Sequence, residues 1–153
     1  MKKILVLALL LFSFCSAKSQ TKEETEKWLE EKLYAFGSYD NSSEAILLQE
    51  VIVRDCEIII TLGGPYVEGI QTIPINSSLV LMSDGFYHFK GEILGKWLDK
   101  ITSVERGLTS GRTRNYKVPT SFLRLSLQDD MLERIQKALE YYRKLCGVDN
   151  EPF

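Results

Sequence analysis

Cys56 and Cys146, which lie far apart in the chain, are the residues with the clearest chemical options. Cys56 begins the alternating run "CEIIITL", so its side chain should share one strand face with Ile58, Ile60 and Leu62. Cys146 falls in the last turn of an amphipathic helical pattern, near the centre of the apolar face. We therefore expect both thiols to point into the core. A reactive or metal-binding role does not fit, because reactive cysteines are at least partly exposed.

The two thiols could form a disulfide or stay as separate buried side chains. An even number of cysteines in an exported chain favours pairing. Closing a loop of about 90 residues would stabilise the fold by about 4.6 kcal/mol in a chain-entropy model. Free cysteine is nevertheless among the most buried residue types. The spacing alone does not bring the two Cα atoms within about 7 Å of each other, so both alternatives stay open.

The chain has a single histidine, His88, and any Ser-His-Asp triad would have to use it. Ser83 and Asp84 are close in sequence, but closeness in sequence does not create triad geometry, and the chain has no Gly-x-Ser-x-Gly motif. A zinc site needs three or four protein ligands, and one histidine with two core-facing cysteines does not readily supply them. We predict no catalytic centre, no metal site and no cofactor, and we expect His88 to be a solvated or hydrogen-bonded strand residue.

Other motifs are weaker. The glycines of "LGGPYVEGI" lack the spacing and the Lys-Ser/Thr pair of a phosphate-binding loop, so we expect a hairpin turn there. Asp40, Asn41 and Glu44 lack the spacing of a calcium-binding loop. Carboxylate pairs of the kind that glycosidases use stay open, because only the fold brings such pairs together.

One basic segment stands out in an otherwise acidic protein. The stretch "GLTSGRTRNYK" contains Arg112, Arg114 and Lys117, with Tyr116 between them and no acidic residue. As a loop, it could bind a small anionic ligand or an acidic partner protein. The alternative is a solvated turn between two strands. An exposed edge of the sheet, which could add a partner's strand, is a second candidate surface.

The first residues, "MKKILVLALLLFSFCSAKSQ", have the pattern of a secretory signal peptide: two lysines, an apolar run and then small residues. The run is shorter than the about 20 residues that a membrane span needs. We expect cleavage after Ser19 or Ala17 and a protein exported to the periplasm or the extracellular space. A lipid anchor on Cys15 is disfavoured, because Phe14 is too bulky for the preceding position.

The remaining chain predicts one α+β domain over residues 20–148, with a short tail over 149–153. Removing Lys2, Lys3 and Lys18 with the signal would leave 16 basic and 21 acidic residues. This net negative charge argues against nucleic acid or an anionic membrane as a partner. No later segment is apolar enough to span a membrane.

Apolar spacing predicts a helix over 21–36 and a longer amphipathic helix that begins with a capping box at Ser126 and Asp129 and runs to Cys146. Between them, short β-rich runs separated by turn residues predict six or seven antiparallel strands, over residues 46–55, 56–62, 69–76, 78–82, 86–91, 100–105 and 116–127. In the last run, Leu123, Leu125 and Leu127 share one face. The intervening segments are too short for the crossovers that parallel strands need.

From about Ala45 to Gly147, this order of elements resembles the pleckstrin-homology-like (PH-like) superfold, in which a bent sheet is capped by a C-terminal helix. The resemblance implies an antiparallel β-roll or barrel with a long C-terminal capping helix, to which this chain adds an N-terminal helix. A cystatin-like or nuclear-transport-factor-like α+β roll is the second fold that fits.

The function expected from these features is that of a small exported binding or protein-interaction module without a catalytic centre. The alternative is a cell-envelope enzyme or enzyme inhibitor whose site is not visible as a motif. An enzyme should have a deep pocket with converging polar groups and strongly shifted pKa values. A binding module needs only a groove or an apolar patch.

Overall fold

The computed structural model describes residues 21–39, 46–64, 67–99 and 112–148. The predicted signal peptide with Cys15, the segment with Asp40, Asn41 and Glu44, the predicted strand over 100–105 and the C-terminal tail lie outside these ranges. The elements, in chain order, are α2 (Lys22–Phe36), β1 (Gly37–Tyr39), β2 (Leu47–Arg54), β3 (Glu57–Gly63), β4 (Val67–Pro74), β5 (Ser78–Leu81), β6 (Tyr87–Asp99), β7 (Arg112–Thr120), β8 (Leu123–Leu125) and α3 (Asp129–Leu145).

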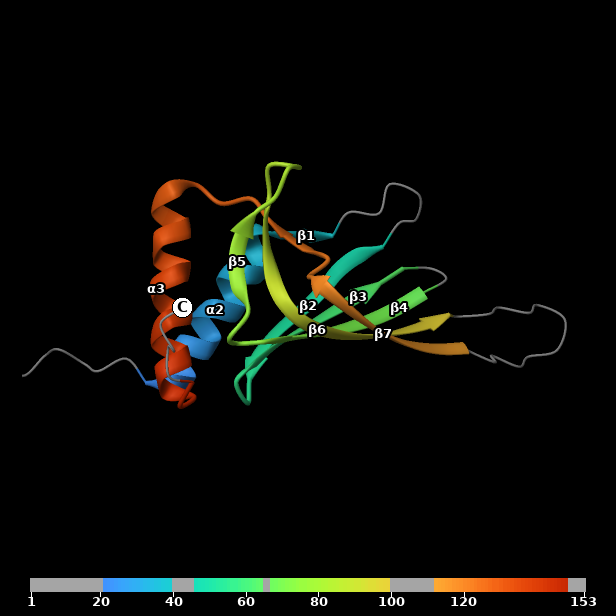
Figure 1. Ribbon diagram of the computed structural model, residues 1–153, viewed down its shortest axis with the longest axis horizontal. Helices are drawn as coiled ribbons and strands as arrows, with labels where there is room; N and C mark the ends of the chain where they lie inside the picture. The colour runs from blue at the N-terminus through green and yellow to red at the C-terminus, as the bar shows by residue number, and fades with distance from the viewer. Residues whose placement is uncertain (1–20, 40–45, 65–66, 100–111, 149–153) are drawn as a thin grey trace, which may run out of the picture.

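The strands form one antiparallel sheet of eight strands with the order β1-β8-β6-β4-β3-β2. The long strand β6 also pairs with β5 and β7, so it joins every part of the sheet. The sheet is nearly closed into a barrel, and α2 and α3 pack at one end of it (Figure 1). The predicted α+β class with an N-terminal helix and a C-terminal helix is therefore confirmed.

Each helix follows from local chemistry. Thr21 caps α2, because its side chain accepts a hydrogen bond from the Glu24 backbone while the Glu24 side chain accepts one from the Thr21 backbone. In α3, acidic residues fill the first turn and basic residues the last, as the helix dipole favours. The predicted capping box at Ser126 is wrong: the N-cap is Gln128, and no side chain bonds there.

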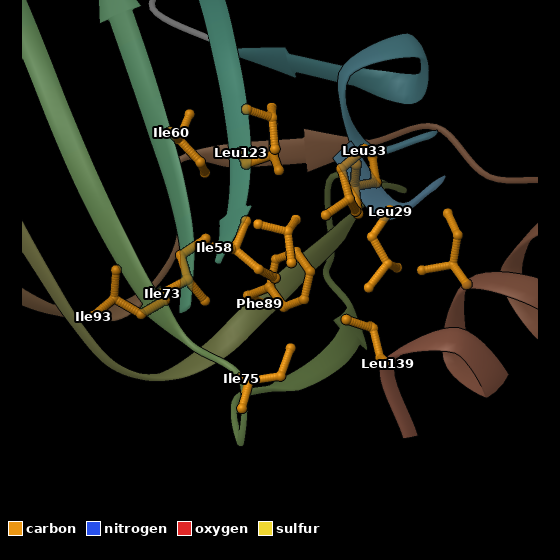
Figure 2. Close-up of a cluster of buried hydrophobic side chains, with 14 of the residues drawn as sticks. Leu29, Leu33, Ile58, Ile60, Ile73, Ile75, Phe89, Ile93, Leu123 and Leu139 are labelled. Carbon is orange, nitrogen blue, oxygen red and sulfur yellow. The ribbon is translucent and has the colours of Figure 1, made fainter. Parts of the chain in front are cut away.

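The core lies between the concave face of the sheet and the two helices. Leu29 and Leu33 of α2 and Leu139 of α3 point toward Ile58 and Phe89 of the sheet, and all five are at most 1% exposed (Figure 2). The predicted alternation of the last strand is confirmed for Leu123 and Leu125, which are completely buried, whereas Leu127 lies beyond the end of β8 and is only partly buried.

Three strand predictions need correction. The sequence predicted a strand that stops near Gly91, but β6 continues to Asp99 through two glycines, because pairing with β4 and β7 outweighs their weak strand propensity. The predicted strand over 116–127 is two strands, which separate at Ser121 and Phe122. Residues 37–39 lie between the predicted helix and the first predicted strand, but they form β1 by pairing with β8.

We call the end that carries α2 and α3 the helix end. The tight turn between β2 and β3 lies there, and it consists of Asp55 and Cys56, both with positive φ. Cys56 is therefore a turn residue and not a strand residue, although it packs against the core. It forms a disulfide with Cys146, the C-cap of α3, and the two Cα atoms are 5.8 Å apart. The opposite end, where β3 runs toward β4 and β6 toward β7, is the loop end (Figure 1).

Candidate functional site

The predicted basic loop is a strand from Arg112 onward. β7 pairs with β6 along its whole length, so its side chains alternate between the two faces of the sheet. Arg114 and Tyr116 belong to the inner face, whereas Lys117 belongs to the outer face and forms an ion pair with Glu92 at 2.5 Å. The side chain of Arg112 lies outside the described part of the chain. The structure therefore does not bring the basic residues together on one surface.

Tyr116 instead joins three other rings at the loop end. Tyr39 of β1, Trp97 of β6, Tyr116 of β7 and Phe122 of the β7–β8 connection form an aromatic cluster with ring-centroid distances of 5.6 to 6.3 Å. The rings of Trp97 and Tyr116 are stacked, with an interplanar angle of 23°. All four side chains are only half-buried. Four separate segments thus present aromatic surface at one place.

Two glycines make room for these rings. A Cβ atom at Gly95 would lie 1.9 Å from Cζ of Tyr116, and one at Gly69 would lie 2.4 Å from Cζ3 of Trp97. Both rings therefore lie directly on the backbone of β4 and β6, where any larger residue would displace them. Glycine inside a strand often marks this kind of close approach.

Polar groups lie beneath the rings. Gln71 is completely buried, and its Oε1 accepts a hydrogen bond from the Phe122 backbone at 2.9 Å. Its Nε2 has no hydrogen-bond partner within the described ranges, and neither has the buried hydroxyl of Tyr116. Burial raises the pKa of Tyr116 to about 12, with a further contribution from Tyr39, while the nearby Gln71 amide opposes the rise. The amide and the phenol are thus neighbours that do not reach normal hydrogen-bond geometry.

Arg114 is the charged residue nearest to this cluster in the strand register. It pairs with Trp97 across β6 and β7, so the two side chains leave the same face of the sheet, and Arg114 is exposed. A guanidinium group beside aromatic rings can bind an anionic group while the rings contact the apolar part of the same ligand.

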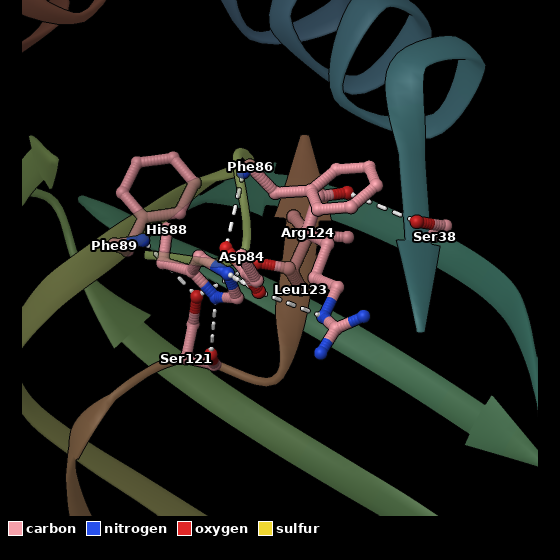
Figure 3. Close-up of polar contacts among 8 residues, drawn as sticks. All are labelled: Ser38, Asp84, Phe86, His88, Phe89, Ser121, Leu123 and Arg124. Carbon is pink, nitrogen blue, oxygen red and sulfur yellow. Dashed lines mark hydrogen bonds and ion pairs between the residues drawn. The ribbon is translucent and has the colours of Figure 1, made fainter. Parts of the chain in front are cut away.

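His88 belongs to a different, structural cluster (Figure 3). Its Nε2 lies 3.0 Å from Asp84 Oδ2, and its Nδ1 lies 3.1 Å from the backbone oxygen of Ser121. The Ser121 hydroxyl instead accepts a hydrogen bond from the Phe89 backbone and donates one to the Leu123 oxygen. No described hydroxyl contacts the imidazole, so this cluster is not a nucleophile–base pair. His88 is hydrogen-bonded and buried, which is one of the two expected states.

Asp84 connects this cluster to β8. It accepts a hydrogen bond from the Phe86 backbone at 3.0 Å and forms an ion pair with Arg124 at 3.3 Å. The Phe86 backbone N–H lowers the pKa of Asp84 most, and His88 and Arg124 lower it further. The cluster therefore fixes the start of β6 against the last strand.

The outer face of the sheet carries a separate apolar surface. Ile70 on β4 and Leu94 and Leu98 on β6 are 43%, 51% and 36% exposed. A groove of about 390 Å³ lies beside Ile70 and Leu94, bordered by Lys96 and Asn115. This groove is the kind of surface that a binding module has.

Trp97, Phe122, Tyr39 and Gln71 did not stand out in the sequence, and only Tyr116 of the aromatic cluster did. A signal was present in "GEILGKWLD", where Gly95 and Trp97 are two residues apart and must share a strand face. The convergence itself depends on the pairing of β6 with β4 and β7, which the sequence did not predict.

No protein-family model, curated protein or solved structure matches the chain. In the described ranges, no helix is both long and apolar enough to cross a membrane, and no group of His, Cys, Asp and Glu side chains could hold a metal ion. The case for a functional site therefore rests on the geometry of the aromatic cluster and the outer face.

Proposed function

We propose that this protein is a small exported binding module whose ligand site consists of the aromatic cluster and Arg114. The observation that carries the proposal is the convergence of four half-buried rings over two buried polar groups, Gln71 Nε2 and Tyr116 Oη, that lack hydrogen-bond partners among the described residues. A site of this composition fits a small ligand with a planar apolar part and an anionic end.

The chemistry of the site supports this ligand class. Aromatic side chains offer large apolar contact area with little loss of conformational freedom. A buried polar group without a hydrogen bond destabilises a protein by about 1–3 kcal/mol, so a ligand that supplies the missing partner gains affinity. Arg114 would then pair with the anionic end of the ligand.

The fold and the location belong to the same proposal. An antiparallel, barrel-like sheet followed by a long helix supports a PH-like architecture. The pattern of the first 19 residues supports export to the periplasm or the extracellular space.

The alternative, a cell-envelope enzyme or enzyme inhibitor, has less support. Large pKa shifts in the described ranges belong to Tyr116 and Tyr142, and both shifts are upward. A raised phenol pKa keeps the group protonated and does not activate it as a base or nucleophile.

Anilinonaphthalene sulfonate is a suitable probe because it combines aromatic rings with one anionic group. In a Trp28→Phe background, energy transfer to the bound probe reports on Trp97 alone, since the chain has two tryptophans. We expect Phe122→Ala and Arg114→Gln each to weaken binding by about tenfold, which corresponds to the loss of one good contact. Circular dichroism should confirm that the variants stay folded.

Two controls separate this site from other apolar surfaces. Leu94→Ser on the outer face should leave probe affinity unchanged. The uncharged analogue phenyl naphthylamine should lose affinity in Phe122→Ala but not in Arg114→Gln, because it has no anionic group to pair with the guanidinium. Unchanged sulfonate binding in both inner-face variants, or a loss in Leu94→Ser only, would reject the aromatic cluster as the ligand site.

A further inference from the structure

The outer face of the sheet suggests an interaction that is independent of the ligand site. The strand register places outward side chains in rows across β2, β3, β4 and β6. One row is Ile52, Ile59, Thr72 and Leu94, and the next row is Glu50, Thr61, Ile70 and Lys96. Ile70 and Leu94 are 43% and 51% exposed, so neither helix covers this face. A row of exposed and partly exposed β-branched and leucine side chains is suited to packing against another sheet.

The charges on this face are arranged in a complementary order. Along β2, the outward residues are Glu50, Ile52 and Arg54. Along β6, in the same direction across the sheet, they are Lys96, Leu94 and Glu92. Where a row has a charged residue on β2, it has a residue of opposite charge on β6. Each of the two strands has an apolar residue between its charged ones.

We propose that two copies of this chain associate through these outer faces, related by a two-fold axis that runs along the strands between β3 and β4. This rotation places β2 of one copy over β6 of its partner and β3 over β4. The apolar rows then pack together as in a β-sandwich, with sheets about 10 Å apart.

The rotation brings opposite charges together at each end of the row. Glu50 lies over the partner's Lys96, Ile52 over the partner's Leu94, and Arg54 over the partner's Glu92. The symmetry repeats each contact once. Glu92 already forms an ion pair with Lys117 within its own copy, and both side chains are more than half exposed. The carboxylate of Glu92 can therefore accept a second cation from the partner.

The alternative is a two-fold axis in the same plane but perpendicular to the strands. An axis of this kind through the Leu94 row would still bring Lys96 over the partner's Glu92, but it would bring Lys117, which pairs with Leu94 in the strand register, over its own copy. Like charges facing each other across an interface are unfavourable, so charge complementarity favours the axis along the strands. The inner face with the aromatic cluster stays open in this dimer.

Sedimentation equilibrium of the purified chain over a range of concentrations tests the association. We expect a monomer–dimer equilibrium in the wild type. Lys96→Glu should raise the dissociation constant by at least about tenfold, because it places two like-charged pairs in the interface. Adding Glu50→Lys to Lys96→Glu should restore the wild-type constant to within about threefold. Lys144→Glu, a charge reversal at another exposed position, on α3, is the matched control and should leave the dissociation constant unchanged.

Cross-linking tests the geometry. Ile52→Cys and Leu94→Cys are prepared as two separate proteins and treated with a short bismaleimide. We expect cross-linked dimers only when the two proteins are mixed, because position 52 of one copy faces position 94 of the other. A monomer at all concentrations would overturn the proposal. Efficient cross-linking of either variant with itself would overturn the proposed axis, as would a failure of the Glu50→Lys change to rescue Lys96→Glu.

Discussion

The two ends of the molecule are built in different ways. At the helix end, specific bonds join α3 to the rest of the fold. The Tyr142 hydroxyl donates to Glu26 at 2.5 Å and accepts from the Cys56 backbone at 3.3 Å. Arg143 donates to the backbone oxygens of Ile75 and Ser77, each at 2.7 Å, and the disulfide joins α3 to the β2–β3 turn. At the loop end, stacked rings cover buried polar groups that have no hydrogen-bond partner in the part of the chain that the structure describes.

This difference supports the proposal that the helix end stabilises the fold and that the loop end binds a ligand. Among the described residues, the helix end also contains a buried hydroxyl without a hydrogen-bond partner, Ser77 Oγ, but Arg143 donates a hydrogen bond to the backbone oxygen of the same residue. The described residues of the loop end include two buried polar groups without a hydrogen-bond partner, which lie next to half-buried rings. Proteins tend to violate local rules of hydrogen bonding at functional sites and to compensate elsewhere. We therefore infer that the bonds of the helix end stabilise a fold whose other end is adapted to binding.

The disulfide gives the largest test of this comparison. Replacing both Cys56 and Cys146 by alanine should lower the free energy of unfolding by about 4.6 kcal/mol, because the unfolded chain regains the freedom of the whole loop between them. Urea denaturation with and without a reducing agent measures the loss. Probe binding at the loop end should persist while the variant is folded. A loss below about 1 kcal/mol would show that the helix end does not depend on this bond.

Two tyrosines allow a matched test of both ends. Tyr142→Phe removes a hydroxyl with two hydrogen bonds and leaves the partly buried Cys56 N–H without its acceptor, so we expect a loss of about 1–3 kcal/mol. Tyr116→Phe removes a buried hydroxyl that has no hydrogen-bond partner within the described ranges, so stability should stay the same or rise slightly. Urea denaturation of the two variants at neutral pH is the measurement. Equal losses would mean that the Tyr116 hydroxyl has a partner, and the contrast between the ends would fail.

Gly95→Ala tests how closely the rings of the loop end depend on the sheet. The added methyl group would occupy the position of the Tyr116 ring, so the ring must move away from the strand. We expect a destabilisation of about 1 kcal/mol, the lower part of the range for overpacking, because the half-buried ring can shift. Probe affinity should fall at the same time. Gly85→Ala has free space around it and serves as the control for probe binding, although its positive φ adds some strain.

The fold could be predicted to a large extent because local signals agreed with it. The α2 helix has a complete capping box and ends at Gly37, and β2, β3 and α3 follow their apolar periodicity. The failures have a common physical cause. Gly91 and Gly95 interrupt strand propensity inside β6, and only pairing with neighbouring strands keeps that segment extended.

The candidate site was predicted much less well, because a site made by strand pairing has no linear motif. Tyr116 was selected for its basic neighbours, yet its contacts are Trp97 and Phe122, which come from other segments. Lys117 was grouped with Arg114, but the alternation of a strand sends the two side chains to opposite faces. The same alternation, once the register is known, reveals the charge order on the outer face.

The smallest effect that we expect concerns alkaline pH. The pKa of Tyr116 is raised from its usual value of 10 to about 12 in the folded protein, chiefly by burial. Between pH 10 and about pH 12, Tyr116 loses its phenol proton in the unfolded chain but keeps it in the folded protein. The free energy of unfolding therefore decreases as the pH rises from the unfolded pKa to the folded pKa. Tyr116→Phe should reduce this decrease, whereas Tyr34→Phe, at an exposed position, should not. Urea denaturation at neutral pH and at about pH 11 measures the difference. An equal alkaline loss in Tyr116→Phe and the wild type would show that the phenol at the loop end is not shielded from water, which would weaken its place in the proposed site.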